Sequence, residues 1–196
     1  MIATCPINSL LIKIFSGYSF RRRIIHDDDG DLRVIQMKDL MHHYSAIKIS
    51  GLTRVYSENL ERKTLLAKGD VLLVAKGAHN CALEYDLNLP MAIASSAFFV
   101  LRPDPEKVLP AYLAWYLNQS NVQNFFAANQ SGSYMLSVAK TTLERVTVQL
   151  PSREIQEKIV AVDKLVRKEG LLMQSIMQKK KMLVTSALMK LVDKKV

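Results

Sequence analysis

The densest group of cations that could contact a polyanion lies near the N-terminus. Arg21, Arg22 and Arg23 are consecutive and follow two aromatic residues. Arginine side chains neutralise phosphates and pair in bidentate fashion with guanine O6 and N7, so this run is suited to DNA contact. The alternative interpretation is that the three arginines are solvated and offset the acidic run 27–29 across a turn.

A second candidate is the polar segment after the apolar run 71–75. It contains Lys76, His79 and Asn80. A polar loop at the end of a rigid strand is a common place for recognition groups, and an asparagine amide can pair with adenine in bidentate fashion. The alternative is an ordinary loop at the end of a strand.

Two further polar stretches complete the candidate DNA contacts. Residues 129–135 read NQSGSYM and contain the hydroxyl groups of Ser131, Ser133 and Tyr134, which are suited to phosphate binding. Lys48 and Arg54 lie on either side of a glycine and could contribute two more cations. Together these stretches predict a surface that binds double-stranded DNA.

The sequence contains no catalytic constellation that we recognise. Base methylation would need a glycine-rich turn and an Asn/Asp-Pro-Pro-aromatic motif, and neither is present. Residues 102–107, RPDPEK, contain the letters of a PD…ExK nuclease site, but they are crowded into one proline-bounded turn. There is no phosphate-binding GxxxxGK[ST] loop, and the four histidines lack cysteine or histidine partners at zinc spacing. We therefore expect a non-catalytic protein without a metal or cofactor.

Composition favours one globular domain with an appendage. The chain has 196 residues, of which 49% are hydrophobic, enough for one substantial core. Its net charge is +9, but residues 151–196 hold 11 basic and 5 acidic residues, so two thirds of the excess lies there. A solvated helix surface explains that charge as well as nucleic acid does. No apolar run is long enough to cross a membrane, and two cysteines make no disulfide framework, so we expect a cytoplasmic protein.

The pattern of short apolar runs predicts an α+β fold. Strands are expected at 32–37, 65–67, 71–75, within 82–102 and at 147–150. Helices are expected at 112–118 and 122–128, with a helical turn at 141–145. Because strands and helices do not alternate regularly, we expect a mixed, twisted β-sheet with short helices rather than a doubly wound sheet.

One long helix is predicted after residue 152 and almost to the C-terminus. Steps of four and three residues from 155 to 190 meet an apolar residue at eight of eleven positions, typical of a helix that pairs as a coiled coil. The seam residues predicted to pair are Ile155, Ile159, Val162, Val166, Met173, Ile176 and Leu183. Gly170 predicts a kink or break. The helix could fold back on the domain or pair with another chain.

The junction between strand and helix carries a resemblance to a known family. Residues 143–166, LERVTVQLPSREIQEKIVAVDKLV, resemble the hinge of the specificity subunits of type I restriction–modification systems, with matches at Leu150, Pro151, Glu154, Gln156 and Ile159. Six further stretches resemble the same family in the same order: SGYSFR, VIQMKDL, LAKGDVLLVAKG, YLAWYLN, SGSY and LSVAKTTLERVTVQLP. Such subunits usually carry two recognition domains and two long helices, and this chain resembles half of one.

The resemblance implies a division of labour along the chain. Residues 1–150 would form a target-recognition domain, with the 129–135 loop on its DNA-facing side. Residues 151–196 would form a helix for dimerisation, spacing and docking of a methyltransferase. Partner subunits would methylate adenine, and a restriction subunit would cleave. A homodimer would rebuild the two-domain arrangement and require a palindromic, bipartite site. The alternative function is a helical scaffold or regulator that binds a partner helix without reading DNA.

Overall fold

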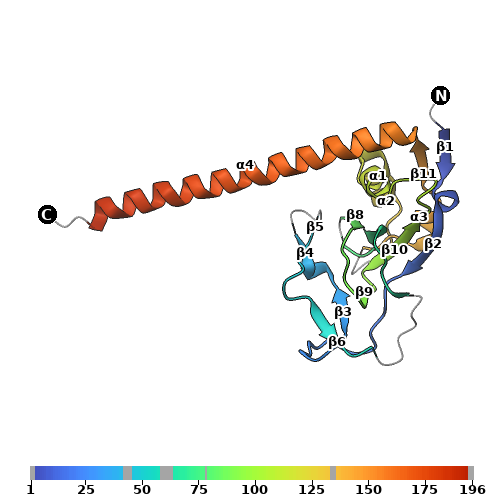
Figure 1. The fold of residues 1–196 in the computed structure, drawn as a ribbon, viewed down its shortest axis with the longest axis horizontal. Coiled ribbons are helices and arrows are strands. Elements are labelled where there is room, and N and C mark those ends of the chain that lie inside the picture. The colour runs from blue at the N-terminus through green and yellow to red at the C-terminus, as the bar shows by residue number, and fades with distance from the viewer. Residues whose placement is uncertain (1–2, 42–45, 58–63, 78, 133–135, 194–196) are drawn as a thin grey trace. The chain divides into compact units, whose positions relative to one another are not determined.

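The computed structural model describes residues 3–41, 46–57, 64–77, 79–132 and 136–193. These residues divide into two compact units, and the division falls between Glu157 and Lys158. The first unit contains all the strands and short helices of the described residues, and the second consists of helix (Figure 1). The predicted α+β class with a long C-terminal helix is confirmed.

A four-stranded antiparallel sheet forms the centre of the first unit. Its strand order is β2 (Leu11–Ser16), β10 (Phe98–Pro103), β7 (Asp70–Val74) and β8 (Ala82–Tyr85). Every residue of β7 is buried, as expected for a continuous apolar run covered on both faces. The sequence therefore located this strand within one residue at each end.

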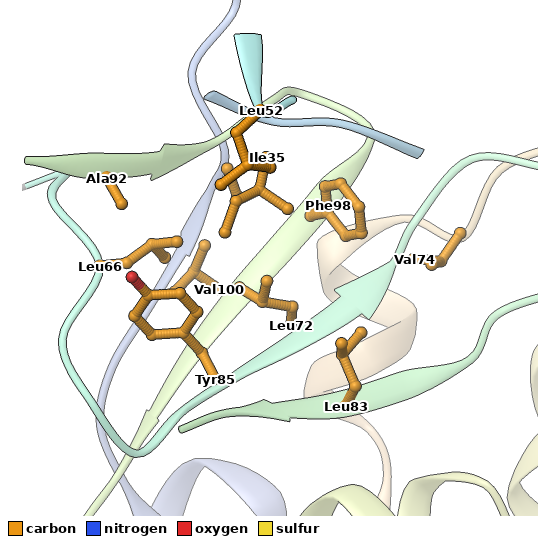
Figure 2. Packing of buried hydrophobic residues seen from close by; sticks show 11 residues of the cluster. Ile35, Leu52, Leu66, Leu72, Val74, Leu83, Tyr85, Ala92, Phe98 and Val100 are labelled. Atoms are coloured by element: carbon orange, nitrogen blue, oxygen red, sulfur yellow. The ribbon is translucent and has the colours of Figure 1, made fainter. Parts of the chain in front are cut away.

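A second sheet of three strands contains the parallel pair that makes the architecture mixed. Strand β3 (Leu32–Ile35) pairs antiparallel with β6 (Thr53–Val55) and parallel with β9 (Ala92–Ala94). Side chains from both sheets meet in one hydrophobic cluster. In Figure 2, Leu72 and Tyr85 point into the same space as Ile35, and all three are buried.

The remaining elements cover the edges and ends of these sheets. Strand β1 (Ala3–Pro6) lies beside β11 (Thr147–Leu150) in Figure 1 and pairs with it antiparallel. The other short elements are η1 (Ile7–Leu10), η2 (Met37–Asp39), β4 (Leu40–Met41), β5 (Ala46–Ile47), α1 (Pro110–Leu117), α2 (Ser120–Ala128) and α3 (Lys140–Glu144). The predicted strand at 147–150 and the short helices are confirmed.

The strand predicted at 65–67 is wrong. This segment does not pair with a strand through a ladder of hydrogen bonds. Its backbone makes separate hydrogen bonds, one of them from the Leu66 amide to the Ala92 carbonyl at 2.8 Å. Leu65 accepts a hydrogen bond from Arg102 Nη2 at 3.0 Å through its carbonyl oxygen, and the Ala67 amide donates to Asp70 Oδ2 at 2.8 Å. The partners that decide its conformation are therefore polar residues that a hydrophobic pattern does not register.

Helix α4 (Arg153–Asp193) runs for 41 residues without interruption, so the break expected at Gly170 is wrong. One glycine costs about 1 kcal/mol in a helix, too little to interrupt so long a segment. The first turn of α4 belongs to the globular unit. The buried amide of Gln156 accepts from the Leu109 amide at 2.9 Å and donates to the Pro151 carbonyl at 3.0 Å.

The crossing between β2 and the second sheet leaves no room for a side chain at Gly17. A Cβ atom there would lie 2.7 Å from the Ala94 carbonyl oxygen and closer still to that of Ser95. We expect Gly17→Ala to lower the free energy of unfolding by about 1–3 kcal/mol, as overpacking does. Urea unfolding followed by circular dichroism measures this change.

The matched control for that substitution is Gly170→Ala. A Cβ atom at position 170 meets nothing within 4 Å, and alanine favours the helix by about 0.5–1 kcal/mol. Gly170→Ala should therefore stabilise the protein. Equal effects of the two alanines would contradict the close approach at residue 17.

Candidate nucleic-acid interface

Three segments emerge side by side at one end of the four-stranded sheet. Strand β2 ends at Ser16, opposite Phe99, and β7 ends at Val74, opposite Phe98. Because both strands run antiparallel to β10, their last residues meet the first residues of β10. The segments that continue from them are 17–23, 75–80 and 95–97. We call this end of the sheet, with these three segments, the loop end.

Backbone hydrogen bonds hold these segments together beyond the sheet. The Gly17 amide donates to the Phe98 carbonyl at 2.9 Å, and the Ala75 amide donates to the Ala97 carbonyl at 2.8 Å. Tyr18 forms an isolated bridge with Ser95. The loop that contains Arg21, Arg22 and Arg23 and the loop that contains Lys76 therefore start from one rigid platform.

Residues 136–138 lie against the loop after β7, and Ser131 pairs with them. The Val138 amide donates to the Ala75 carbonyl at 2.9 Å, and the Gly77 amide donates to the Leu136 carbonyl at 2.8 Å. Ser131 and Ser137 exchange two backbone bonds of 3.0 and 2.9 Å. Lys76 and Ser131 each form a bridge with Ser137, so the structure places both next to this residue from positions far apart in the chain. Ser133 and Tyr134, predicted in the same loop, lie outside the described residues.

The cations of the loop end point to solvent. Arg21, Arg22, Arg23 and Lys76 are exposed, as is His79. Lys76 Nζ lies 3.5 Å from Ser96 Oγ, a neighbour that sequence reasoning missed because the two residues lie in loops 20 residues apart in the chain. Phosphate groups could reach these charges without rearrangement of the platform.

The acidic run near the arginines is occupied by its own local contacts. Asp28 accepts from His26 Nε2 at 3.0 Å, and Asp27 Oδ1 accepts from the Asp29 amide at 3.0 Å. Among the described residues, none of the three arginines forms an ion pair with this run. The arginines are exposed, so any offset of the acidic charge acts without a direct ion pair.

Asn80 is buried inside its loop in this structure, which gives it a structural role and leaves its contact with adenine a prediction. Its side chain is 2% exposed. Nδ2 donates to the Val74 carbonyl at 2.9 Å, and Oδ1 accepts from Gln130 Nε2 at 2.6 Å. With both ends of the amide engaged inside the loop, Asn80 fixes the loop's shape and has no free edge for a base.

Lys48 follows β5 and Arg54 lies on β6 of the second sheet, so neither belongs to the loop end. Arg54 is half-buried on β6, and its Nε donates to the Gly30 carbonyl at 2.8 Å. Burial raises the pKa of Asp39, while the Gln36 amide, Lys38 and Lys48 act in the opposite direction. Lys48 thus opposes the effect of burial on the Asp39 carboxylate, which is 6% exposed.

The second unit exposes the predicted seam. Val162, Val166, Met173, Ile176 and Leu183 are each more than half exposed. Ile155, in the first unit, is also exposed, and Ile159, in the second unit, is half-buried. The apolar band is wider than the predicted seam. Leu165 and Leu172 are exposed and lie on the same side of the helix, at spacings of three and four residues from Val162 and Ile176.

Other kinds of site were also sought in the described part of the chain. It contains no group of three histidine, cysteine or acidic side chains that could hold a metal ion. No helix among the described residues is both long and apolar enough to span a bilayer. The loop end and the apolar band of α4 are the two candidate features that the structure supplies for the predicted function.

Comparisons with known proteins agree with the fold. Residues 11–178 match the family model described as Type I restriction modification DNA specificity domain. A sequence comparison with curated proteins gave no match.

Three solved structures are similar in fold. The S subunit of the type I restriction-modification system from M. genitalium gives a TM-score of 0.62 at 14% identity, over 99% of this chain and 47% of its own. The HsdS subunit from Thermoanaerobacter tengcongensis gives 0.63 at 16% identity, over 96% and 48%. A chain from a structure of the assembling type I R-M system gives 0.72 at 15% identity, over 98% and 45%. The chain thus spans about half the length of these proteins.

Proposed function

The chain belongs to the family of type I restriction–modification DNA specificity domains, and from this premise we propose that residues 1–150 read one half of a bipartite site in double-stranded DNA. The observation that supports this proposal is the convergence of Arg21–Arg23, Lys76 and Ser131 on the loop end. Cations on phosphates supply most of the affinity for DNA, and neighbouring polar groups then reach base edges.

We also propose how residues 151–196 act. The apolar band of α4 pairs with the same band of a second copy, which sets the distance between two half-sites and makes the site palindromic. The paired helices dock a DNA adenine methyltransferase subunit, and a restriction subunit joins the same complex. In this proposal the chain selects DNA in the cytoplasm and performs no chemistry itself. A helical scaffold that does not read DNA is the alternative, which the exposed apolar band alone would equally support.

The phosphate contacts can be tested without knowledge of the target sequence. We expect Arg21→Ala combined with Lys76→Ala to weaken binding to a duplex oligonucleotide. The slope of log K against log salt should fall by about 1.8, because each phosphate contact contributes about 0.9. Fluorescence anisotropy at several NaCl concentrations gives this slope.

The matched control removes two cations from the opposite end of the same strands. Lys68 precedes β7 and Lys107 follows β10, and both are exposed. Lys68→Ala combined with Lys107→Ala changes the net charge equally and should leave the slope within error. If the salt slope falls equally in both double variants, binding is non-specific attraction to a basic protein and the proposed interface is wrong.

The partner and the site can be read in one experiment. The chain is co-expressed with its modification subunit in a host without DNA methylation, and adenine methylation is mapped across the genome. We expect methylation at a palindromic site with a fixed gap. Methylation at an asymmetric site would indicate that the chain pairs with a different half-subunit and not with a second copy of itself. Absence of methylation, with both proteins soluble and associated, would favour the scaffold alternative.

A further inference from the structure

A small open pocket lies between the segment that leaves β2 and strand β6. Its volume is about 240 Å³. The floor is Leu32, which is 1% exposed and packs with Val34 and Ile93 in a separate apolar cluster. Tyr18 and Phe20 form one wall, with ring centroids 4.8 Å apart in an edge-to-face arrangement. A packed floor and wall give this pocket a defined shape.

The mouth of the pocket combines exposed apolar surface with positive charge. Ile25 is 76% exposed and Tyr56 is 55% exposed, unusual values for side chains of this size. Arg22 and Arg23 also line the pocket. Among the described residues neither guanidinium has a hydrogen-bond or ion-pair partner. Flat apolar surface and free guanidinium groups thus occur within one small site.

The charge of the lining favours an anionic ligand. The described lining residues include two arginines and no carboxylate. The nearest acid in sequence is Asp31, which accepts hydrogen bonds from the Ser57 hydroxyl at 2.6 Å and the Ser57 amide at 2.8 Å. The hydrogen bond from the Ser57 hydroxyl is the main cause that lowers the pKa of Asp31, and desolvation acts in the opposite direction. Among the described residues, the Asp31 carboxylate therefore interacts with Ser57 and not with the arginines.

We propose that this pocket binds one unstacked nucleotide of the bound DNA, with the base against Tyr56, Ile25 and the aromatic wall and the phosphate on Arg22 and Arg23. This inference rests on the proposed DNA-reading function. Aromatic side chains and guanidinium planes are the usual platforms for unstacked bases, and arginine is the usual phosphate partner. The volume lies below the range of roughly 300–1,000 Å³ typical of drug-sized ligands, which suits a single base better than a dinucleotide.

The first test uses a free nucleotide and the full chain. The protein is labelled at isoleucine δ1 methyl groups and titrated with thymidine 5′-monophosphate. Ile24 and Ile25 both line the pocket, so their signals should shift in a saturable way from the ring current of the base. Deoxyribose 5-phosphate and inorganic phosphate should shift them much less. Equal shifts with inorganic phosphate, or no shift at either methyl, would overturn the proposal.

Variants separate the base from the phosphate. Tyr56→Ala should lower the affinity for the nucleotide by about 5- to 150-fold, the range for loss of one stacking partner. Arg22→Ala combined with Arg23→Ala should lower the affinity for the nucleotide and also the affinity for the sugar phosphate. Lys68→Ala is the control and should leave both unchanged, because it lies before β7 at the other end of the sheet. Unchanged affinity in the Tyr56 and arginine variants would overturn the assignment.

The second test uses DNA and distinguishes this inference from the function on which it rests. A duplex with one unpaired, bulged nucleotide has no unstacking cost and should bind at least about ten-fold more tightly than a perfect duplex of equal length. Tyr56→Ala should remove that difference. If the bulge has no effect while Arg21→Ala with Lys76→Ala still lowers the salt slope, only the pocket inference fails. If no duplex binds, the proposed function fails as well.

Discussion

Asp70→Ala is expected to lower the free energy of unfolding by about 3–5 kcal/mol, the range for breaking one partner out of a buried ion pair. The Asp70 side chain is 1% exposed. Its two oxygens accept from Arg102 Nε at 2.7 Å and Arg102 Nη2 at 2.8 Å, a bidentate pair. Removal of the carboxylate leaves a guanidinium and the Ala67 amide without their acceptor.

Two features of the pair place the effect near the lower end of that range. The Arg102 side chain is 28% exposed, so water can solvate part of the abandoned charge. Arg102 Nη2 also keeps its bond to the Leu65 carbonyl at 3.0 Å. Arginine keeps its proton in folded proteins, so in the variant the guanidinium stays charged and cannot escape the penalty by losing a proton.

Urea unfolding measures the loss, and a surface pair provides the control. Lys140 and Glu144 lie 3.7 Å apart and are both partly exposed. Glu144→Gln should change the free energy of unfolding by no more than about 0.5 kcal/mol. If Asp70→Ala is as mild as Glu144→Gln, the pair does not hold the segment before β7, and the explanation given for residues 65–67 is wrong.

Met173→Lys combined with Ile176→Lys is expected to abolish self-association of the chain. Both residues are exposed in the single chain, at 57% and 64%. In a symmetric pair each lysine occurs twice, and each buried, unpaired charge costs several kcal/mol. The dissociation constant should therefore rise by more than about 100-fold. Sedimentation velocity across micromolar concentrations measures it.

The matched control introduces the same charges on the opposite side of the helix. Gln174 and Gln178 are exposed and each lies two residues from Ile176, which turns them away from the seam. Gln174→Lys with Gln178→Lys should leave the dimer intact. A seam variant that still dimerises would place the interface elsewhere in the protein, and a wild-type chain that is monomeric at micromolar concentration would remove the homodimer proposal.

The structure also changes how the helix should be removed. A cut after Leu150 would take away Gln156, whose buried amide satisfies the Leu109 amide and the Pro151 carbonyl. Such a truncation would damage the recognition unit and confuse loss of folding with loss of pairing. A cut after Glu157 follows the division between the two units and keeps these bonds. That fragment should be a folded monomer that retains salt-dependent DNA binding.

Local patterns in the sequence were enough to determine most elements. The run at 71–75 is continuous and apolar, and it forms the fully buried strand β7. The strand at 147–150, the proline after it and the apolar seam that follows predicted β11 and α4. These features depend on periodicity and on proline, which act over a few residues, so they can be predicted from the sequence alone. Gly170 misled the prediction because the cost of one glycine is small beside the rest of the helix.

The candidate site could be predicted only in part, because sequence patterns report local structure and the site depends on contacts between distant residues. Residue type identified Arg21–Arg23 and Lys76 as cations suited to phosphates, but only the antiparallel register of β2, β10 and β7 places their loops at one end of a sheet. Asn80 has the side chain of a base reader, and a contact with Gln130, fifty residues away, makes it part of the loop's interior. The pocket lined by Arg22 and Tyr56 likewise joins distant segments. Such contacts depend on the packing of the whole unit, so only the tertiary structure decided them.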